Sequence, residues 1–300
     1  MRRFCVSVAA ASMLTLAAAA CGGDDSAGSN AEPRLTIDKG VDADSFSDAS
    51  VRIDNTWFPL TPGTQFIYEG RANRGGGVLP HRTVFTVTDL TKEINGVNTV
   101  VMLDQDLNEG RLAEQEITFH AQDDEGNVWN FGEYPEEYEN GKFVGAESTW
   151  LAGVRRSQAG ILMRAEPRPG TSSYLQGWAP TVEFRDRAKV TGTGERHCVE
   201  AKCYDDLLVI DETAPLEPAD GHQLKYYARN VGNVLVEPRG GVEQEVLELI
   251  EMKRLTPKEL AELRATALAL DKRAYTVEDS EDVWRGTERA KRTLTADESA

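Results

Sequence analysis

The most constraining feature of the chain is a run of alternating apolar and polar residues between positions 115 and 145. Every second side chain of 117–121 is apolar, and 128–132 repeats the pattern with two aromatic side chains on one face. Acidic, Asn and Gly residues interrupt the alternation at 123–127 and at Asn140-Gly141. Period-two alternation broken by such turn residues is typical of antiparallel strands joined by hairpins. The stretch therefore predicts an antiparallel meander.

The same pattern continues on both sides of this stretch. Residues 82–94 alternate, Asn95-Gly96 is the strongest short hairpin signal, and 98–105 carry the chain back. Further segments with strand character lie at 65–69, 111–121, 173–178, 181–190, 204–212, 223–229, 233–237 and 242–253. Trp57 and Phe58 precede the first of them and are expected to plug one end of the core.

So many short strands before residue 254 favour a mainly β (α+β) domain. A single sheet of this size usually curls or splits into two. The expected fold is a curved antiparallel sheet, half-barrel or barrel-like, followed by C-terminal helices. The expected domain organisation is a signal peptide at 1–20, a flexible tether at 21–50, a β domain at 51–254 and a helical segment at 255–300.

The helical segment begins with a clear start signal. Thr256 is an N-cap candidate, Pro257 suits the first helical position, and Glu259 completes a capping box. Apolar residues then recur at helical spacing, at Leu260, Leu263, Ala267 and Leu270. The pattern predicts a helix at 257–272 and a second, short helix at 282–294. The first helix could pack across the open side of the curved sheet.

The N-terminus indicates export. Arg2 and Arg3 precede an uncharged run at 4–20, which is the pattern of an export signal. The residues before Cys21 resemble a bacterial lipoprotein cleavage box, although Ala18 stands where Leu is commonest. Cys21 is therefore predicted to be the lipid anchor, carrying acyl chains such as palmitate, since two chains suffice for stable anchoring. The alternative is an ordinary secretory signal with an accidental cysteine.

The charge and the remaining cysteines support an extracytoplasmic location. The formal net charge of −17 opposes binding to nucleic acid or to anionic lipid head groups. Membrane contact is therefore expected only through the N-terminal lipid. Cys198 and Cys203 are spaced to close a hairpin with a disulfide in an oxidising compartment. The alternative, half of a zinc site, would have only His197 nearby, so no metal is expected.

Three motifs resemble those of a known group of proteins. They read N-x-W-F-P-L-x-P-G-T from residue 55, A-Q-D-x-x-G-N-V-W-x-F-G-E from residue 121, and K-Y-Y-A-x-x-V-G-x-V from residue 225. In this order they resemble a family of uncharacterised bacterial exported proteins and lipoproteins, over roughly residues 55–250. The resemblance implies a curved β-sheet domain on the cell envelope, and it implies no activity.

Two acidic segments could carry chemistry. The turn at 123–127 is rich in the oxygen ligands that calcium prefers, but it lacks EF-hand spacing and reads more simply as a hairpin turn. The segment Glu133–Glu139 places carboxylates beside Tyr134 and Tyr138, which could serve a hydrolase of envelope glycan or lipid. A solvated loop is the simpler interpretation of that segment. The carboxylates concerned are those of Glu133, Glu136, Glu137 and Glu139.

No other segment suggests catalysis. The chain has no H-E-x-x-H metal motif, no G-x-S-x-G nucleophile motif and no nucleotide-binding loop. The sequence therefore favours a non-catalytic protein without a cofactor, and it identifies no catalytic residue and no protein partner.

The aromatic residues on the strands suggest a binding role. Trp129, Phe131 and Trp150 are the candidate ligand-lining residues. If the C-terminal helix fills the concave face of the sheet, the protein is a scaffold. Otherwise such residues line a cavity for an apolar or amphipathic ligand, such as a lipid or another envelope component. A filled core is the commoner arrangement.

Overall fold

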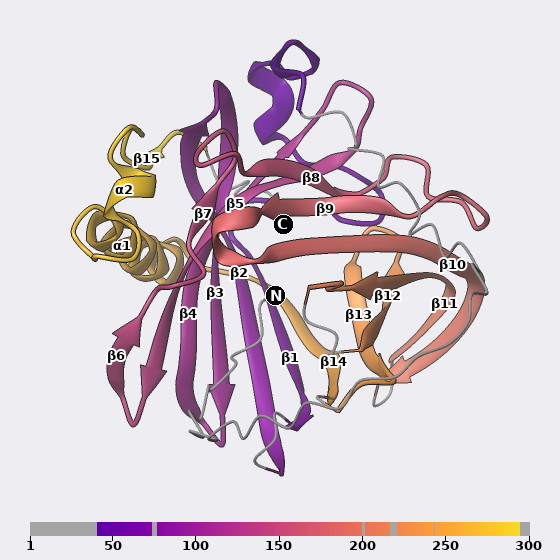
Figure 1. Ribbon diagram of the computed structural model, residues 1–300. Coiled ribbons are helices and arrows are strands. Elements are labelled where there is room, and N and C mark those ends of the chain that lie inside the picture. The colour runs from indigo at the N-terminus through magenta and orange to yellow at the C-terminus, as the bar shows by residue number, and fades with distance from the viewer. Residues whose placement is uncertain (1–40, 74–76, 200–201, 217–220, 243, 295–300) are drawn as a thin grey trace, which may run out of the picture. The chain divides into compact units, whose positions relative to one another are not determined.

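The computed structural model describes residues 41–73, 77–199, 202–216, 221–242 and 244–294 (Figure 1). The predicted signal peptide and Cys21 lie outside these residues. Within them the chain is mainly antiparallel strand, with helices after residue 256, which confirms the predicted fold class. None of the helices in these ranges has the length and hydropathy needed to span a bilayer.

The strands form one sheet that closes on itself. Its strands are β1 (Thr64–Asn73), β2 (Val78–Ile94), β3 (Val97–Asn108), β4 (Arg111–Gln122), β5 (Val128–Glu139), β8 (Gln158–Met163), β9 (Tyr174–Ala179), β10 (Phe184–Val199), β11 (Lys202–Thr213), β12 (His222–Ala228), β13 (Gly232–Arg239) and β14 (Gln244–Arg254). They pair in the order β1-β14-β13-β12-β11-β10-β9-β8-β5-β4-β3-β2, and β1 also pairs with β2. The described strands thus close a twelve-stranded antiparallel barrel.

Three short strands and three 3-10 turns of the described chain lie outside the twelve barrel strands. β6 (Lys142–Gly145) and β7 (Trp150–Leu151) pair with β5, and β15 (Lys291–Arg292) pairs with β2. Closure matters physically because it satisfies the backbone groups that an edge strand would expose. The 3-10 turns are η1 (Ala43–Ser45), η2 (Asp48–Val51) and η3 (Pro180–Val182).

Two-residue turns set the register of the first strands. Asn95-Gly96 connects β2 to β3 with φ of 51° and 78°, and Ile94 pairs directly with Val97. Both central residues need positive φ in this hairpin turn, which Asn and Gly adopt most readily. Register decides which face each side chain occupies, so these turns determine the contents of the barrel interior.

The pleat of the strands separates two apolar clusters. Val100 on β3 belongs to the cluster inside the barrel, together with Phe66 and Leu249. Val101, the next residue, belongs to a cluster on the outside of the barrel, together with Phe119. Successive side chains of a strand point to opposite faces, so one strand serves both clusters.

The segment before β1 packs into the interior cluster. Trp57 is buried in the interior cluster and Phe58 packs against it. Asn55 holds this segment in place, because its side-chain oxygen accepts the backbone N–H groups of Trp57 and Phe58. Its amide also donates to the carbonyl oxygens of Gly126 and Arg164.

The long helix α1 (Pro257–Ala274) lies outside the barrel, at the left of Figure 1. It begins at the predicted capping box of Thr256 and Glu259. Its buried face includes Ala267 and Leu270, which join the outer cluster beside β2 to β5. The helix therefore covers the outer face of these strands and leaves the concave interior to other side chains.

Buried charges attach the C-terminal segment to the sheet. Arg264 of α1 donates two hydrogen bonds of 2.6 Å to Asp89 of β2. Lys92 of β2 donates to Asp271 of α1 at 3.0 Å. The predicted second helix is shorter than expected: α2 spans only Glu281–Trp284. After it the chain pairs with β2 through β15, and this strand pairing replaces the remaining helical turns.

Candidate functional site

The Glu133–Glu139 segment is strand, not loop, and the simpler sequence interpretation of it was wrong. It forms the second half of β5, so its side chains alternate between the two faces of the sheet. Glu136 faces α1 and accepts hydrogen bonds from Tyr134 (2.7 Å), Tyr138 (2.6 Å) and Arg273 (2.7 and 2.5 Å). Glu133 lies opposite Thr118 of β4, on the interior face. Glu133 and Glu136 therefore cannot flank one scissile bond.

The three candidate ligand-lining aromatic residues do not share one site: Trp129 and Phe131 pack in the outer cluster, and Trp150 lies in a separate small cluster. Phe131 belongs to the outer cluster, and Trp129 donates from Nε1 to Asp123 at 2.7 Å. Trp150 stacks on Phe184 with ring centroids 5.1 Å apart. None of the three belongs to the interior cluster of the described chain. Their ligand-lining role stays a prediction.

The acidic turn after β4 uses its first carboxylate to hold the turn together. Asp123 accepts hydrogen bonds from the backbone N–H groups of Glu125 and Asn127, and from the Asn127 side chain. These donors favour the hairpin-turn interpretation over a calcium site, because both carboxylate oxygen atoms of Asp123 already accept hydrogen bonds from the protein. The described residues contain no group of three or more His, Cys, Asp or Glu side chains placed to hold a metal ion.

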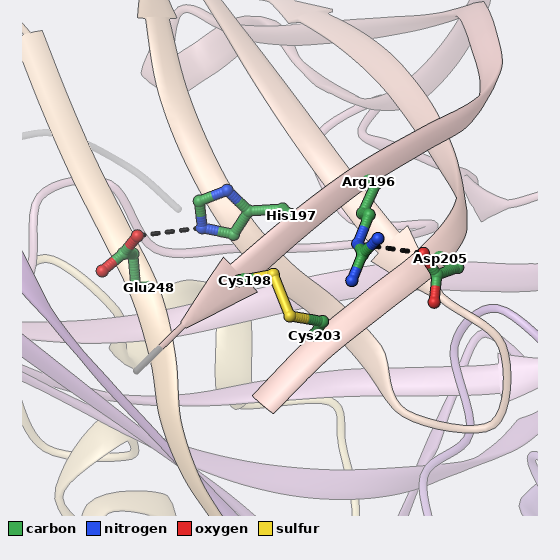
Figure 2. The surroundings of a disulfide bond; sticks show 6 residues. All are labelled: Arg196, His197, Cys198, Cys203, Asp205 and Glu248. Carbon is green, nitrogen blue, oxygen red and sulfur yellow. Dashed lines mark hydrogen bonds and ion pairs between the residues drawn. A yellow bond between two sulfur atoms is a disulfide. The ribbon is translucent and has the colours of Figure 1, made fainter. Parts of the chain in front are cut away.

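The predicted disulfide is confirmed and joins β10 to β11 across their hairpin (Figure 2). Cys198 and Cys203 are direct cross-strand partners with their Cα atoms 4.0 Å apart. His197 contacts Glu248 of β14 at 2.9 Å (Figure 2). Arg196 pairs with Asp205 at 3.2 Å beside the bridge. Because the two sulfur atoms are bonded to each other, neither cysteine offers the thiolate that the alternative zinc site would need.

The feature that sequence reasoning missed is a row of carboxylates inside the barrel. Asp104 of β3 pairs directly with Glu116 of β4, and Asp106 pairs with Glu114. All four lie on the face that also carries Val100 and Met102 of the interior cluster, because their positions differ by even numbers. Asp104 and Glu116 are only 7% and 4% exposed. The sequence contains a signal for this row: acidic residues two positions apart, at 104 and 106 and again at 114 and 116, share one face of a strand.

Two of these carboxylates have unpartnered oxygen atoms. Asp104 Oδ1 and Glu116 Oε2 are buried without a hydrogen-bond partner in the described structure. Asp104 receives one long hydrogen bond of 3.4 Å on Oδ2 from Thr118. Among the described residues, no Lys, Arg or His forms an ion pair with Asp104, Glu114 or Glu116. Buried polar atoms normally have partners, so these oxygen atoms require an explanation.

The electrostatics follow from this burial. Burial raises the pKa of Asp104 to about 8, and the neighbouring Glu133 carboxylate adds to the shift. Burial and neighbouring carboxylates raise the pKa values of Glu114 and Glu116 well above their usual range. Burial lowers the pKa of His120 to about 4, so this imidazole is neutral and does not compensate the carboxylates at pH 7. Asp104, Glu114 and Glu116 therefore retain protons at pH values at which exposed carboxyl groups are ionised.

One end of the carboxylate row is closed by a histidine. His81 of β2 lies 3.2 Å from Asp106 and 3.0 Å from Glu245 of β14. Its Nδ1 is also 2.8 Å from the side-chain oxygen of Asn108. A protonated His81 would therefore compensate the outer carboxylates of the row rather than Asp104 and Glu116.

Tyrosines of β1, β9 and β12 face the same interior. Tyr68, Tyr174 and Tyr227 all belong to the interior cluster. Burial raises the pKa of Tyr68, with further contributions from Tyr204 and Asp104. Tyr68 donates to the carbonyl oxygen of Asn233 at 2.9 Å, whereas the buried hydroxyl of Tyr174 has no hydrogen-bond partner.

We call this arrangement the interior site and define it by three carboxylates and two phenols. Its residues are Tyr68, Asp104, Glu114, Glu116 and Tyr174. The apolar residues around it, such as Phe66 and Met102, give the site an amphipathic character. Such a combination can hold a molecule that has both an apolar part and a polar group.

No family model and no curated protein matches this chain. The chain is similar in structure to an exported protein with a YmcC-like fold from Bacteroides fragilis, with a TM-score of 0.40 and 16% identity. It is also similar to a lipoprotein from Parabacteroides distasonis, with a TM-score of 0.35 and 16% identity. Each similarity covers 67% of this chain and 100% of the other. These distant similarities assign no activity.

Proposed function

We infer that the protein is an exported, lipid-anchored envelope protein that binds an amphipathic small molecule inside its barrel and does not catalyse a reaction. The export signal and Cys21 support the location and the anchor. The position of α1 on the outer face supports the binding role, because the helix does not fill the interior.

One observation carries the binding function. The barrel interior contains buried polar atoms without partners, at Asp104, Glu116 and Tyr174. A core that served stability alone would be filled by apolar groups, since a buried unsatisfied polar group costs about 1–3 kcal/mol. Proteins retain such destabilising polar groups mainly at functional sites, where the groups contact a ligand.

The test is a binding titration with a fluorescent lipid probe. The mature chain is secreted with Cys21→Ser, so that it carries no acyl chains of its own. We expect saturable binding with one site per chain. Native mass spectrometry of the same protein, purified without detergent, should show an added mass that denaturation removes.

Two variants on adjacent residues provide a matched comparison. Val100→Phe adds bulk to the interior cluster, whereas Val101→Phe adds the same bulk to the outer cluster. Both variants overpack a buried position, so each should lower the free energy of unfolding by about 1–3 kcal/mol. Probe binding should be lost only in Val100→Phe. Absence of saturable binding in the unsubstituted protein, with its circular dichroism intact, would show that the proposed function is wrong.

A further inference from the structure

We propose that the interior site selects ligands that carry a cationic group, an amine or a guanidinium on an apolar body, with the cation held between Asp104 and Glu116. This inference rests on the proposed binding function and names the ligand chemistry of the same site. It follows from two buried carboxyl oxygen atoms, Asp104 Oδ1 and Glu116 Oε2, which have no partner among the described side chains.

The carboxyl groups of the interior site have no cationic partner among the described side chains. Asp104, Glu114 and Glu116 lie on one face of β3 and β4, and no described cationic side chain forms an ion pair with them. Elsewhere in the described chain, buried carboxylates do have such partners: Asp89 has Arg264, and Asp271 has Lys92. Like charges placed directly opposite each other on adjacent strands are destabilising. No described side chain thus supplies a positive charge to these three groups, and without a bound cation they reduce their mutual repulsion by retaining protons.

Asp104 and Glu116 lie close enough for one bound group to contact both. Side chains of directly opposed residues begin about 4.5–5.5 Å apart, so one group can reach both Asp104 and Glu116. Each of them contributes an oxygen atom that has no partner. A cation between the two groups favours their ionised form, which only accepts hydrogen bonds, so the complementary group is a donor with several N–H bonds and a positive charge that displaces the retained protons. An ammonium or a guanidinium meets both requirements.

Aromatic side chains lie beside the carboxylates. Tyr68 and Phe85 lie edge to face at 5.4 Å on the neighbouring strands. Phe85 pairs directly with Asp104, so its ring is adjacent to the carboxylate row. Aromatic rings favour cations through their faces, and the apolar side chains of the interior cluster favour a hydrocarbon body. An anionic head group would instead add negative charge to the row.

The experiment compares dodecylammonium, dodecanol and dodecanoate by isothermal titration calorimetry with the mature Cys21→Ser chain at pH 7. The three ligands share one apolar chain and differ in head-group charge. We expect dodecylammonium to bind at least about tenfold more tightly than dodecanol, which corresponds to about 1.4 kcal/mol. Dodecanoate should bind more weakly than dodecanol.

Substitution of the two carboxylates tests the assigned position. In the double variant Asp104→Asn/Glu116→Gln the preference for the cation over the alcohol should fall to within about threefold, because the charge-assisted hydrogen bonds are lost. Dodecanol should still bind. Glu93→Gln is the matched control, since Glu93 is exposed on β2, and its preference should be unchanged. If the double variant does not fold, Glu116→Gln alone should reduce the preference.

The outcomes separate the two proposals. Equal affinity for dodecylammonium and dodecanol would overturn the cation assignment and leave the binding function intact. Failure of all three ligands and of the fluorescent lipid probe would instead reject the binding function. A titration with calcium chloride alone completes the test: saturable binding of calcium that disappears in the double variant would identify a metal site and overturn the proposal.

Discussion

At the scale of single residues, Asp104 shows how one buried carboxyl group links stability to pH. Its pKa of about 8 in the folded protein lies far above the usual value of 3.8. Between these two values the folded state retains a proton that the unfolded state has released. Stability therefore decreases as the pH rises, wherever the native state binds more protons. The stabilising contribution is complete below pH 4 and is lost as the pH rises through about 8.

The corresponding prediction concerns Asp104→Asn. Without bound ligand, the free energy of unfolding of the unsubstituted protein should fall between pH 5 and pH 8 by more than about 1.4 kcal/mol, the equivalent of one pKa unit. The variant should lose a clear part of this fall, because its amide does not titrate. Urea denaturation at both pH values measures the difference. An unchanged pH dependence would show that Asp104 does not retain its proton in the folded state.

At the scale of elements, α1 is attached to the barrel by charge as much as by apolar contact. Asp271 accepts hydrogen bonds from Lys92 Nζ (3.0 Å), Trp284 Nε1 (3.1 Å) and the backbone N–H of Ala290 (3.1 Å). One carboxylate thus joins the helix to β2, to α2 and to the segment before β15. Both charged side chains of the pair are almost fully buried. Removing one partner should therefore cost far more than removing a surface ion pair.

The prediction at this scale is a stability difference between single and double substitution. Asp271→Leu leaves the Lys92 ammonium buried without its carboxylate partner, which should cost about 3–5 kcal/mol in the free energy of unfolding. Lys92→Met/Asp271→Leu removes both charges and should cost clearly less. Lys258→Ala on the exposed side of α1 is the control and should change stability by under about 0.5 kcal/mol. A double variant as unstable as Asp271→Leu would contradict this account.

At the scale of the whole molecule, the described barrel and the predicted N-terminal anchor would perform separate tasks. Closure of the sheet creates an interior that is apolar on most sides and acidic along β3 and β4. The predicted lipid on Cys21 would hold this domain at a membrane surface through a tether that is rich in Gly, Ser and Asp. This arrangement suits a protein that takes up an amphipathic molecule near a bilayer.

The anchor gives the prediction at this scale. Cys21→Ala should release the protein from the membrane fraction or leave the signal unprocessed, because the acyl chains can no longer be attached. Cell fractionation and intact-mass measurement distinguish these outcomes. A variant that stays in the membrane fraction as a processed species of unchanged mass would contradict the lipoprotein prediction.

Local patterns in the sequence determined much of this protein. Alternating residues and two-residue turns such as Asn95-Gly96 predicted the strands, because backbone preference and period-two burial act within a few residues. The capping box at Thr256 placed the start of α1 for the same reason. The pairing of Cys198 with Cys203 was also predictable, since the two residues are close in sequence and cross-strand in one hairpin.

Other features were decided only by the tertiary structure. Whether Glu133 and Glu136 could cooperate depended on their lying on a strand, and β5 directs them to opposite faces. The side of the sheet that α1 covers depended on which apolar residues closure left outside. The neighbourhood of Asp104 and Glu116 depended on the register between β3 and β4 and on the curvature that turns this face inward. Sequence periodicity assigns residues to a face, but only closure of the barrel determines which face becomes the interior.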